Sequence, residues 1–235
     1  MGAQGQLPEP LEAGAEPVPV LVVPGWGDNA PDVEPIRQRL IGAGWPESRV
    51  STLSFKDPVG SNAEHAAEIE TAVRVLQGLT GARRVDVVAH SMGGLAVRYY
   101  LKRTDLDLGE SADPEAFPVR RVIFLGTPHR GTVAAVLAWG DGGREMVPGS
   151  DFLMRLNEAG PVPEGVDALA LRTPVDLRVI PASSALLRGE RVRNLELCCP
   201  THTQLVDDED TFQVILEFLL HGPDSVAAEP GHEGG

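Results

Sequence analysis

A serine lies between a predicted strand and a predicted helix. The apolar run Val85–Ala89 ends just before Ser91, and the helix-prone segment Leu95–Leu101 follows it. Small residues stand two positions before and two positions after the serine, at Ala89 and Gly93, and larger side chains would collide there in a tight strand-to-helix turn. Such a turn exposes the hydroxyl at a helix N-terminus, where backbone N–H groups and the helix dipole stabilise developing negative charge. We therefore predict that Ser91 is a nucleophile, rather than a serine that only caps the helix.

Acyl transfer by a serine also requires N–H donors for the oxyanion of the tetrahedral intermediate. The backbone N–H of Met92, directly after the serine, is the first candidate. The apolar run Val20–Val23 ends in the turn Pro24–Gly27, whose glycines allow backbone amides to approach a substrate. We assign the second donor to the backbone N–H of Trp26. The alternative is a purely structural turn with the Trp26 side chain packed over the core.

A general base is needed next, and we expect it in a loop after the last strand, because such sites have the chain order serine, acid, histidine. His202 follows the apolar run Val192–Leu197 and precedes a predicted final helix. We therefore assign the base to His202. The other histidines fit worse, since they lie in an early helix, before the serine, after the next strand or near the C-terminus: His65, His90, His129, His221 and His232.

The sequence indicates the acid that should orient this histidine less clearly than it indicates the serine and the histidine. We expect a strand at Leu177–Ile180 and the acid in the loop after it, yet residues 181–189 contain no carboxylate. Glu190, just before the next strand, is therefore the assigned acid, although a plain surface position fits it equally well. Three further carboxylates remain open as alternatives, because an acid after the preceding strand would also reach the site: Asp141, Glu145 and Asp151.

Short apolar runs that alternate with amphipathic segments must position these residues. The predicted strands are Val18–Val23, Val50–Phe55, Val85–Ala89, Val122–Leu125, Leu177–Ile180 and Val192–Leu197. Because these runs are continuously apolar, they suit strands buried on both faces of a parallel sheet. Helices are expected after a capping box of Ser61 and Glu64, from Met92 to Leu101, and across Phe212–Leu219, with the acidic run Asp207–Asp210 in the first turn of the last one. The pattern predicts a three-layer α/β fold, mostly parallel, with helices on both faces of the central sheet.

The chain length of 235 residues suits a single domain, which we place at residues 18–221. Residues 1–17 and 222–235 are rich in Gly, Pro, Glu and Ala, and we expect disordered tails there. A connection of residues 127–173 is too long for an ordinary loop, so we expect a small cap over the site.

Charge and cysteine content exclude several classes of protein. The chain has 20 Lys and Arg against 34 Asp and Glu, a net charge of −14 that disfavours nucleic-acid binding. The two cysteines, Cys198 and Cys199, are adjacent, so we expect neither a disulfide nor a zinc site.

No apolar run is long enough to span a membrane, and residues 1–17 do not resemble a signal peptide. From these two features we expect a cytoplasmic protein. The oligomeric state is not predictable from these features.

Three segments together resemble the α/β-hydrolase superfamily, and within it the small bacterial lipases and esterases: Val85–Gly94 (Val-Asp-Val-Val-Ala-His-Ser-Met-Gly-Gly), Leu125–Thr132 (Leu-Gly-Thr-Pro-His-Arg-Gly-Thr) and the late His202. The resemblance implies the α/β-hydrolase fold, and hydrolysis of carboxylic esters or lipids through a Ser–His–acid triad without metal or other cofactor. Three departures matter: Pro24 stands where the family usually has histidine, residues 181–189 lack the usual aspartate, and this loop is short. The missing aspartate leaves one alternative, a binding or scaffold module with a degraded triad. A second alternative is an amide hydrolase, because it would use the same residues and the fold does not determine the substrate.

Overall fold

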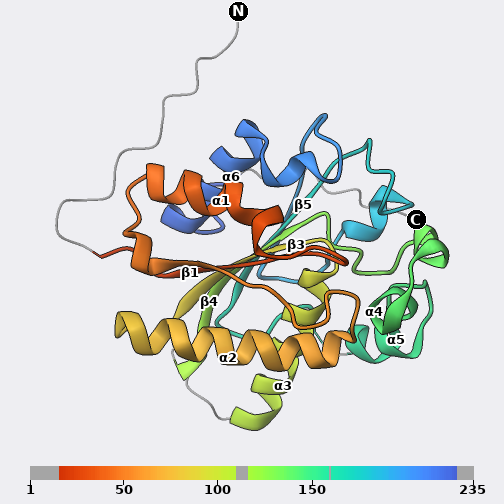
Figure 1. Ribbon diagram of the computed structural model, residues 1–235, viewed down its shortest axis with the longest axis horizontal. Helices are drawn as coiled ribbons and strands as arrows, with labels where there is room; N and C mark the ends of the chain where they lie inside the picture. The colour runs from red at the N-terminus through yellow and green to blue at the C-terminus, as the bar shows by residue number, and fades with distance from the viewer. Residues whose placement is uncertain (1–15, 110–115, 159, 227–235) are drawn as a thin grey trace, which may run out of the picture.

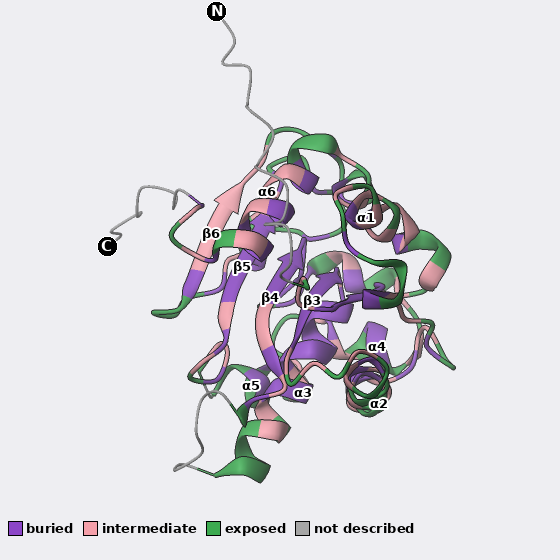
Figure 2. Cartoon of the chain, turned by 90° about the vertical axis from the view of Figure 1, so that its left-hand side faces the viewer, coloured by how far each residue is buried: buried purple, intermediate pink, exposed green. Residues whose placement is uncertain are grey.

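Six strands form one parallel sheet in the computed structural model, which describes residues 16–109, 116–158 and 160–226. The strands are β1 Val20–Val23, β2 Val50–Thr52, β3 Val85–His90, β4 Val119–Leu125, β5 Asp167–Arg172 and β6 Val192–Glu196. Their order across the sheet is β2-β1-β3-β4-β5-β6, and every neighbouring pair is parallel. The central strands are the most deeply buried, as Figure 2 shows, whereas edge strand β6 is mostly half-buried. This confirms the prediction of a buried parallel sheet.

Helices cover both faces of the sheet (Figure 1). They are α1 Ala30–Gly42, α2 Asn62–Thr80, α3 Gly93–Leu108, α4 Gly140–Glu145, α5 Asp151–Asn157 and α6 Glu209–His221. One apolar cluster joins α1 and α6 to one face, and a second joins α2 and α3 to the other. The predicted caps also form, since Ser61 and Glu64 make a capping box on α2 and Asp208 caps α6. The predicted three-layer α/β arrangement is therefore present.

One predicted strand is wrong, and this affects the site. Residues 177–180 form no strand, and the Leu177 side chain is 81% exposed. The strand in this part of the sheet is β5, which lies inside the segment 127–173 that we expected to be a cap. The sequence between β4 and β5 contains the short helix Val133–Leu137 together with α4 and α5. These pieces pack on Met92 and Leu95 at the start of α3 through a small apolar cluster of their own.

The predicted tails lie largely outside the described residues, which exclude 1–15 and 227–235. The described parts contact the folded domain: Arg49 donates a hydrogen bond to the Pro17 carbonyl at 3.1 Å, and Val226 is buried against the α6 side of the core. No helix of the described chain combines the length and the apolar composition needed to cross a bilayer.

Candidate active site

Ser91 occupies the turn between β3 and α3, as predicted. Its φ angle is +53°, in the left-handed region that non-glycine residues seldom adopt. Its backbone N–H donates a 2.8 Å hydrogen bond to the Leu125 carbonyl of neighbouring β4, which anchors the turn on the sheet. Glycines make the turn possible: a Cβ on Gly25 would lie 2.9 Å from the Ser91 Cβ, and a Cβ on Gly93 would collide with the Pro24 carbonyl. The strained serine is held in place by its close packing on both sides.

His202 and Asp176 form a buried pair beyond the carboxyl ends of β5 and β6. The distance from His202 Nδ1 to Asp176 Oδ2 is 2.7 Å, and the two residues are only 3% and 7% exposed. The other carboxylate oxygen, Asp176 Oδ1, accepts hydrogen bonds from the backbone N–H groups of Arg178 and Val179, both at 2.8 Å. A Cβ on Gly126, after β4, would lie 3.0 Å from His202 Nδ1, so glycine leaves room for the imidazole.

The environment keeps this pair in a definite protonation state. Burial raises the pKa of Asp176, but the hydrogen bond from His202 and the two backbone N–H donors outweigh it, so the pKa lies below its ordinary value. Burial lowers the pKa of His202, and the hydrogen bond to Asp176 opposes this only in part. At neutral pH the imidazole is therefore neutral, with its Nδ1 proton directed to a carboxylate and the Nε2 lone pair free to accept a proton.

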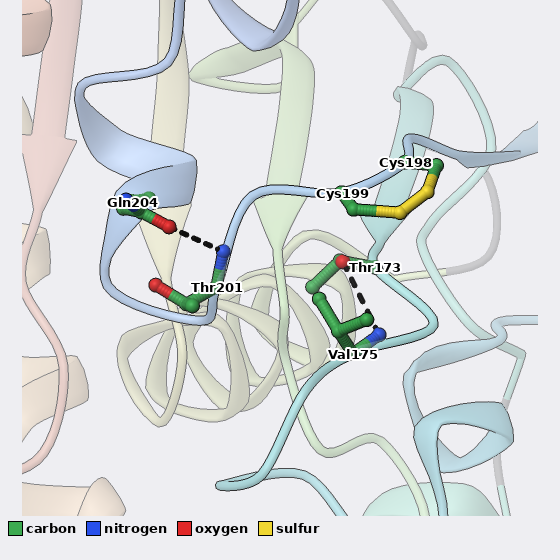
Figure 3. Close-up of a disulfide and its surroundings, with 6 residues drawn as sticks. All are labelled: Thr173, Val175, Cys198, Cys199, Thr201 and Gln204. Atoms are coloured by element: carbon green, nitrogen blue, oxygen red, sulfur yellow. Dashed lines mark hydrogen bonds between the residues drawn. A yellow bond between two sulfur atoms is a disulfide. The ribbon is translucent and has the colours of Figure 1, made fainter.

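Two short turns support the loops that carry the pair, and both are drawn in Figure 3. Before Asp176, the Val175 N–H donates to Thr173 Oγ1 at 3.4 Å; beside His202, the Thr201 N–H donates to Gln204 Oε1 at 2.9 Å. His90 Nε2 also lies 3.0 Å from the His202 carbonyl oxygen, so this second histidine helps to hold the loop. These contacts fix the backbone on both sides of the pair.

The expectation of no disulfide is wrong for this loop. Cys198 and Cys199 are joined to each other just after β6 (Figure 3). The expectation assumed that the two cysteines lie in a strand with their side chains on opposite faces, whereas β6 ends at Glu196, before both of them.

The assignment of the acid to Glu190 is also wrong. Glu190 is exposed and lies before β6, and the carboxylate bonded to His202 is that of Asp176. The reason is the misplaced strand: the carboxylate bonded to His202 does follow a strand, but this strand is β5, which ends at Arg172. The run Ala168–Leu171, buried between two charged residues and followed closely by an aspartate, was the signal that could have found it.

The alternative carboxylates have other partners or lie elsewhere. Glu145 accepts hydrogen bonds from the backbone and side chain of Asn62, each at 2.7 Å, and Asp141 forms an ion pair with Arg144. Asp151 lies in the first turn of α5. None of them is bonded to His202.

Trp26 and Met92 lie next to the serine, as predicted. Among the described residues, neither backbone N–H donates a hydrogen bond to another group of the protein, so both are free for a ligand oxygen. The indole of Trp26 is held separately: its Nε1 donates to the Trp139 carbonyl at 3.0 Å, and the two rings meet edge to face with centroids 4.5 Å apart.

A cavity of about 330 Å³ brings these residues together. Ser91, Trp26 and His202 all line it. Most of the remaining wall is apolar and comes from the segment after β4 and from the loop of Asp176: Pro128, Ala134, Ala135, Leu137, Ala138, Trp139, Met146, Leu177 and Val179. Within the described residues there is no group of three or more His, Cys, Asp or Glu placed to hold a metal ion.

Solved structures with a similar fold include three lipases. Aspergillus fumigatus lipase B superposes with a TM-score of 0.72 at 18% identity; the match covers 87% of this chain and 53% of that one, so this chain spans about half of its length. The mature form of Bacillus licheniformis lipase BlEst2 has a TM-score of 0.70 at 17% identity, with 91% and 95% covered. A Paleococcus ferrophilus monoacylglycerol lipase has a TM-score of 0.62 at 17% identity, with 88% and 97% covered. These similarities, with the six-stranded parallel sheet, show the α/β-hydrolase fold.

The sequence itself matches a family model over most of its length. The model describes the lipase (class 2) family and matches residues 17–197, a range that includes Ser91 and Asp176 but ends before His202. The fold of the chain and this match agree, and the chain belongs to the lipase (class 2) family.

Proposed function

We propose that the protein is a serine hydrolase that cleaves carboxylic esters with an apolar acyl group. Ser91 is the nucleophile, His202 the general base and acid, and Asp176 the carboxylate that orients His202. The backbone N–H groups of Trp26 and Met92 are the oxyanion donors. The reaction needs no metal or other cofactor.

One observation carries the proposal. The 2.7 Å bond between His202 Nδ1 and Asp176 Oδ2 is buried, and His202 lines the same cavity as a serine with a positive φ angle at a helix N-terminus. A carboxylate on Nδ1 leaves Nε2 as the proton acceptor, which is the role that a serine nucleophile requires. These features support a complete serine, histidine and acid set.

The proposed reaction has two steps. In the first, Ser91 Oγ bonds to the ester carbonyl carbon while its proton passes to His202 Nε2, and the resulting oxyanion accepts hydrogen bonds from the two backbone amides. The bond to the alcohol then breaks, and His202 returns the proton to the leaving oxygen. In the second step a water attacks the acyl-serine by the same route, so one water is consumed and one carboxylic acid is released.

The lining of the cavity favours an apolar acyl group. Besides Ser91 and His202, only Asp28, Thr132 and Arg178 are polar among its lining residues, and the others are apolar or aromatic. Leu137, Trp139 and Leu177 are also strongly exposed at its rim, where an acyl chain would cover them. Two of the structural neighbours are lipases by description and one is a monoacylglycerol lipase, which agrees with a lipid or ester substrate.

The sequence left two alternatives, a binding module and an amide hydrolase. The binding module was considered because no acid was found to pair with His202, but the carboxylate of Asp176 is bonded to that histidine. Amide hydrolysis would use the same groups, and no feature of the cavity favours it over ester hydrolysis.

Turnover of p-nitrophenyl butyrate tests the proposal. We expect hydrolysis by the purified full chain and a loss in kcat of about 10⁴-fold or more in Ser91→Ala. Ser48→Ala removes an exposed hydroxyl at a distance from the cavity and is the matched control, with unchanged kcat. Absence of turnover in the folded wild-type protein, or equal activity in Ser91→Ala, would overturn the proposal.

A further inference from the structure

A second cavity is lined in part by His129 and Arg130, in the segment that follows β4. Its volume is about 280 Å³, and its lining residues are Arg98, His129, Arg130, Asn157, Pro161, Leu186, Leu187 and Arg188. Three of these eight residues are arginines, in a chain whose net charge is −14. The segment 127–132 separates it from the cavity of Ser91: Pro128 and Thr132 line that cavity, and the two share no lining residue.

Arg98 is a buried cation without an acidic partner. The residue is 3% exposed, and within the described ranges it forms no ion pair with a carboxylate. Its guanidinium donates to three neutral oxygens: Pro161 O at 3.2 Å, Asn157 Oδ1 at 2.9 Å and Leu156 O at 3.4 Å. A guanidinium has five N–H groups, so about two remain for a ligand.

The charge of Arg98 persists despite its burial. Burial lowers the pKa of Arg98 to about 10, so the side chain is still cationic at neutral pH. A buried charge is costly unless an opposite charge lies near it. An anion in this cavity would supply that charge.

Arg130 and Arg188 add two exposed guanidinium groups to the same cavity. Arg130 Nη2 donates to the Ser183 carbonyl, which holds the side chain near the wall. In the part of the chain that the structure describes, neither arginine is paired with a carboxylate. The cavity therefore has three guanidinium groups, none of which forms an ion pair with an acidic side chain of the described residues.

His129 contributes a buried imidazole whose two nitrogens are not hydrogen-bonded within the described part of the chain. It is 1% exposed, and neither ring nitrogen has a hydrogen-bond partner among the described residues. Burial, followed by the charges of Arg98 and Arg130, holds its pKa well below the ordinary value, so the ring is neutral. Buried polar atoms in folded proteins nearly always have a partner, so an imidazole of this kind in the wall of the cavity is unusual.

Asn157 links the backbone of His129 to the guanidinium group of Arg98. Its side-chain Nδ2 donates to the His129 carbonyl at 3.0 Å, and its Oδ1 accepts from Arg98 Nη1 at 2.9 Å. These two bonds fix which end of the amide faces each neighbour. The polar wall of the cavity is thus formed before any ligand enters.

We propose that this cavity is a binding site for a phosphate group. Three guanidinium groups match a group that carries roughly −1.5 to −2 charge at neutral pH and several acceptor oxygens, better than they match a singly charged carboxylate. The apolar wall of Pro161, Leu186 and Leu187, and a volume larger than one phosphate needs, leave space for a small organic group attached to it. The ligand is inorganic phosphate or the phosphate of a small monoester.

Titration of the ¹⁵N-labelled full chain by NMR tests the site at constant ionic strength. We expect saturable shifts of the backbone amides of residues 186–188 and of the Asn157 side-chain amide on addition of inorganic phosphate or glycerol 3-phosphate. Tighter binding of glycerol 3-phosphate would assign the site to a monoester, and equal binding would assign it to the free ion. The parallel titration with butyrate should give weaker binding than either.

Variants of the exposed arginines test the site without disturbing the fold, because an exposed side chain contributes little to stability. Arg188→Gln and Arg130→Gln should each raise the Kd for phosphate about tenfold, because each removes one charge-assisted contact. Arg74→Gln removes an equivalent exposed arginine on α2, which pairs with Glu70, and should leave the Kd unchanged. The proposal is overturned by no saturable shift up to about 10 mM phosphate, by butyrate binding as tightly as phosphate, or by Arg74→Gln weakening binding as much as Arg188→Gln.

Discussion

The position of the Nδ1 proton of His202 determines what this residue can do. The 2.7 Å bond to Asp176 places that proton between the imidazole and a carboxylate, and two backbone N–H groups hold the carboxylate from the other side. In the proposed reaction, the carboxylate therefore stabilises both the correct tautomer and the imidazolium that forms when His202 takes a proton.

Replacement of the carboxylate by an amide tests this role. Asp176→Asn keeps the size of the side chain but favours the wrong tautomer, so we expect kcat for p-nitrophenyl butyrate to fall by about 10³- to 10⁴-fold. Glu190→Gln, the same change at an exposed position, should alter kcat less than about twofold. If the two variants lost similar activity, the assignment of Asp176 would be wrong.

The pH dependence of kcat/KM reports the pKa of the free base. Since burial lowers the pKa of His202 below its ordinary value of 6.5, the base stays neutral and active in mildly acidic solution. We expect kcat/KM to fall in acidic solution as His202 is protonated, with a midpoint below 6.5. A pH profile with p-nitrophenyl butyrate checks this, and a midpoint above 6.5 would contradict it.

At the scale of elements, the strand-to-helix turn depends on glycines that leave no space for a methyl group. A Cβ at Gly93 would meet the Pro24 carbonyl, which belongs to the rigid turn after β1. We expect Gly93→Ala to lower the free energy of unfolding by about 1–3 kcal/mol and Tm by a few degrees. Thermal unfolding followed by circular dichroism measures the effect.

Gly78→Ala is the control for that substitution. Gly78 lies in α2 with nothing within 4 Å of an added Cβ, so alanine there should stabilise the protein by roughly 0.5–1 kcal/mol. Similar Tm changes in the two variants would show that the turn is not tightly packed.

The elements also show why the sequence predicted Ser91 and His202 but not Asp176. The serine lies between a β-branched run and a glycine pair, and the histidine follows a recognisable last strand, so local patterns mark both. Strand β5 consists of alternating Ala and Leu, which favour helices, and it forms a strand because β4 and β6 pair with it on both sides. Residues 177–180 contain Val and Ile, yet they have no sheet neighbour. Pairing with distant segments determined which of these two runs became a strand, and the local sequence pattern does not show which segments will pair.

At the scale of the whole molecule, an ion pair between the buried Asp86 and the partly exposed Arg120 joins three elements across the sheet. Asp86 in β3 accepts from Arg120 Nε in β4 at 3.0 Å, and Arg120 Nη2 also donates to the Leu219 carbonyl of α6 at 3.0 Å. Burial raises the pKa of Asp86, and the bonds and charges from Arg120 oppose this rise. Removal of the acid would leave the arginine without its partner inside the fold.

We expect Asp86→Ala to destabilise the protein by about 3 kcal/mol, since it breaks a largely buried pair. Asp141→Ala, which removes an acid from an exposed pair with Arg144, should cost less than about 1 kcal/mol. Urea unfolding of both variants gives the comparison. Equal midpoints would mean that the buried pair does not stabilise the sheet.

The most direct test of the central claim is covalent labelling by a fluorophosphonate probe, read by intact mass and peptide mapping. We expect one adduct per chain, located on Ser91, absent in Ser91→Ala, and formed much more slowly in Asp176→Asn than in Glu190→Gln. An unlabelled wild-type protein, an adduct on another residue, or equal labelling of Ser91→Ala would contradict it.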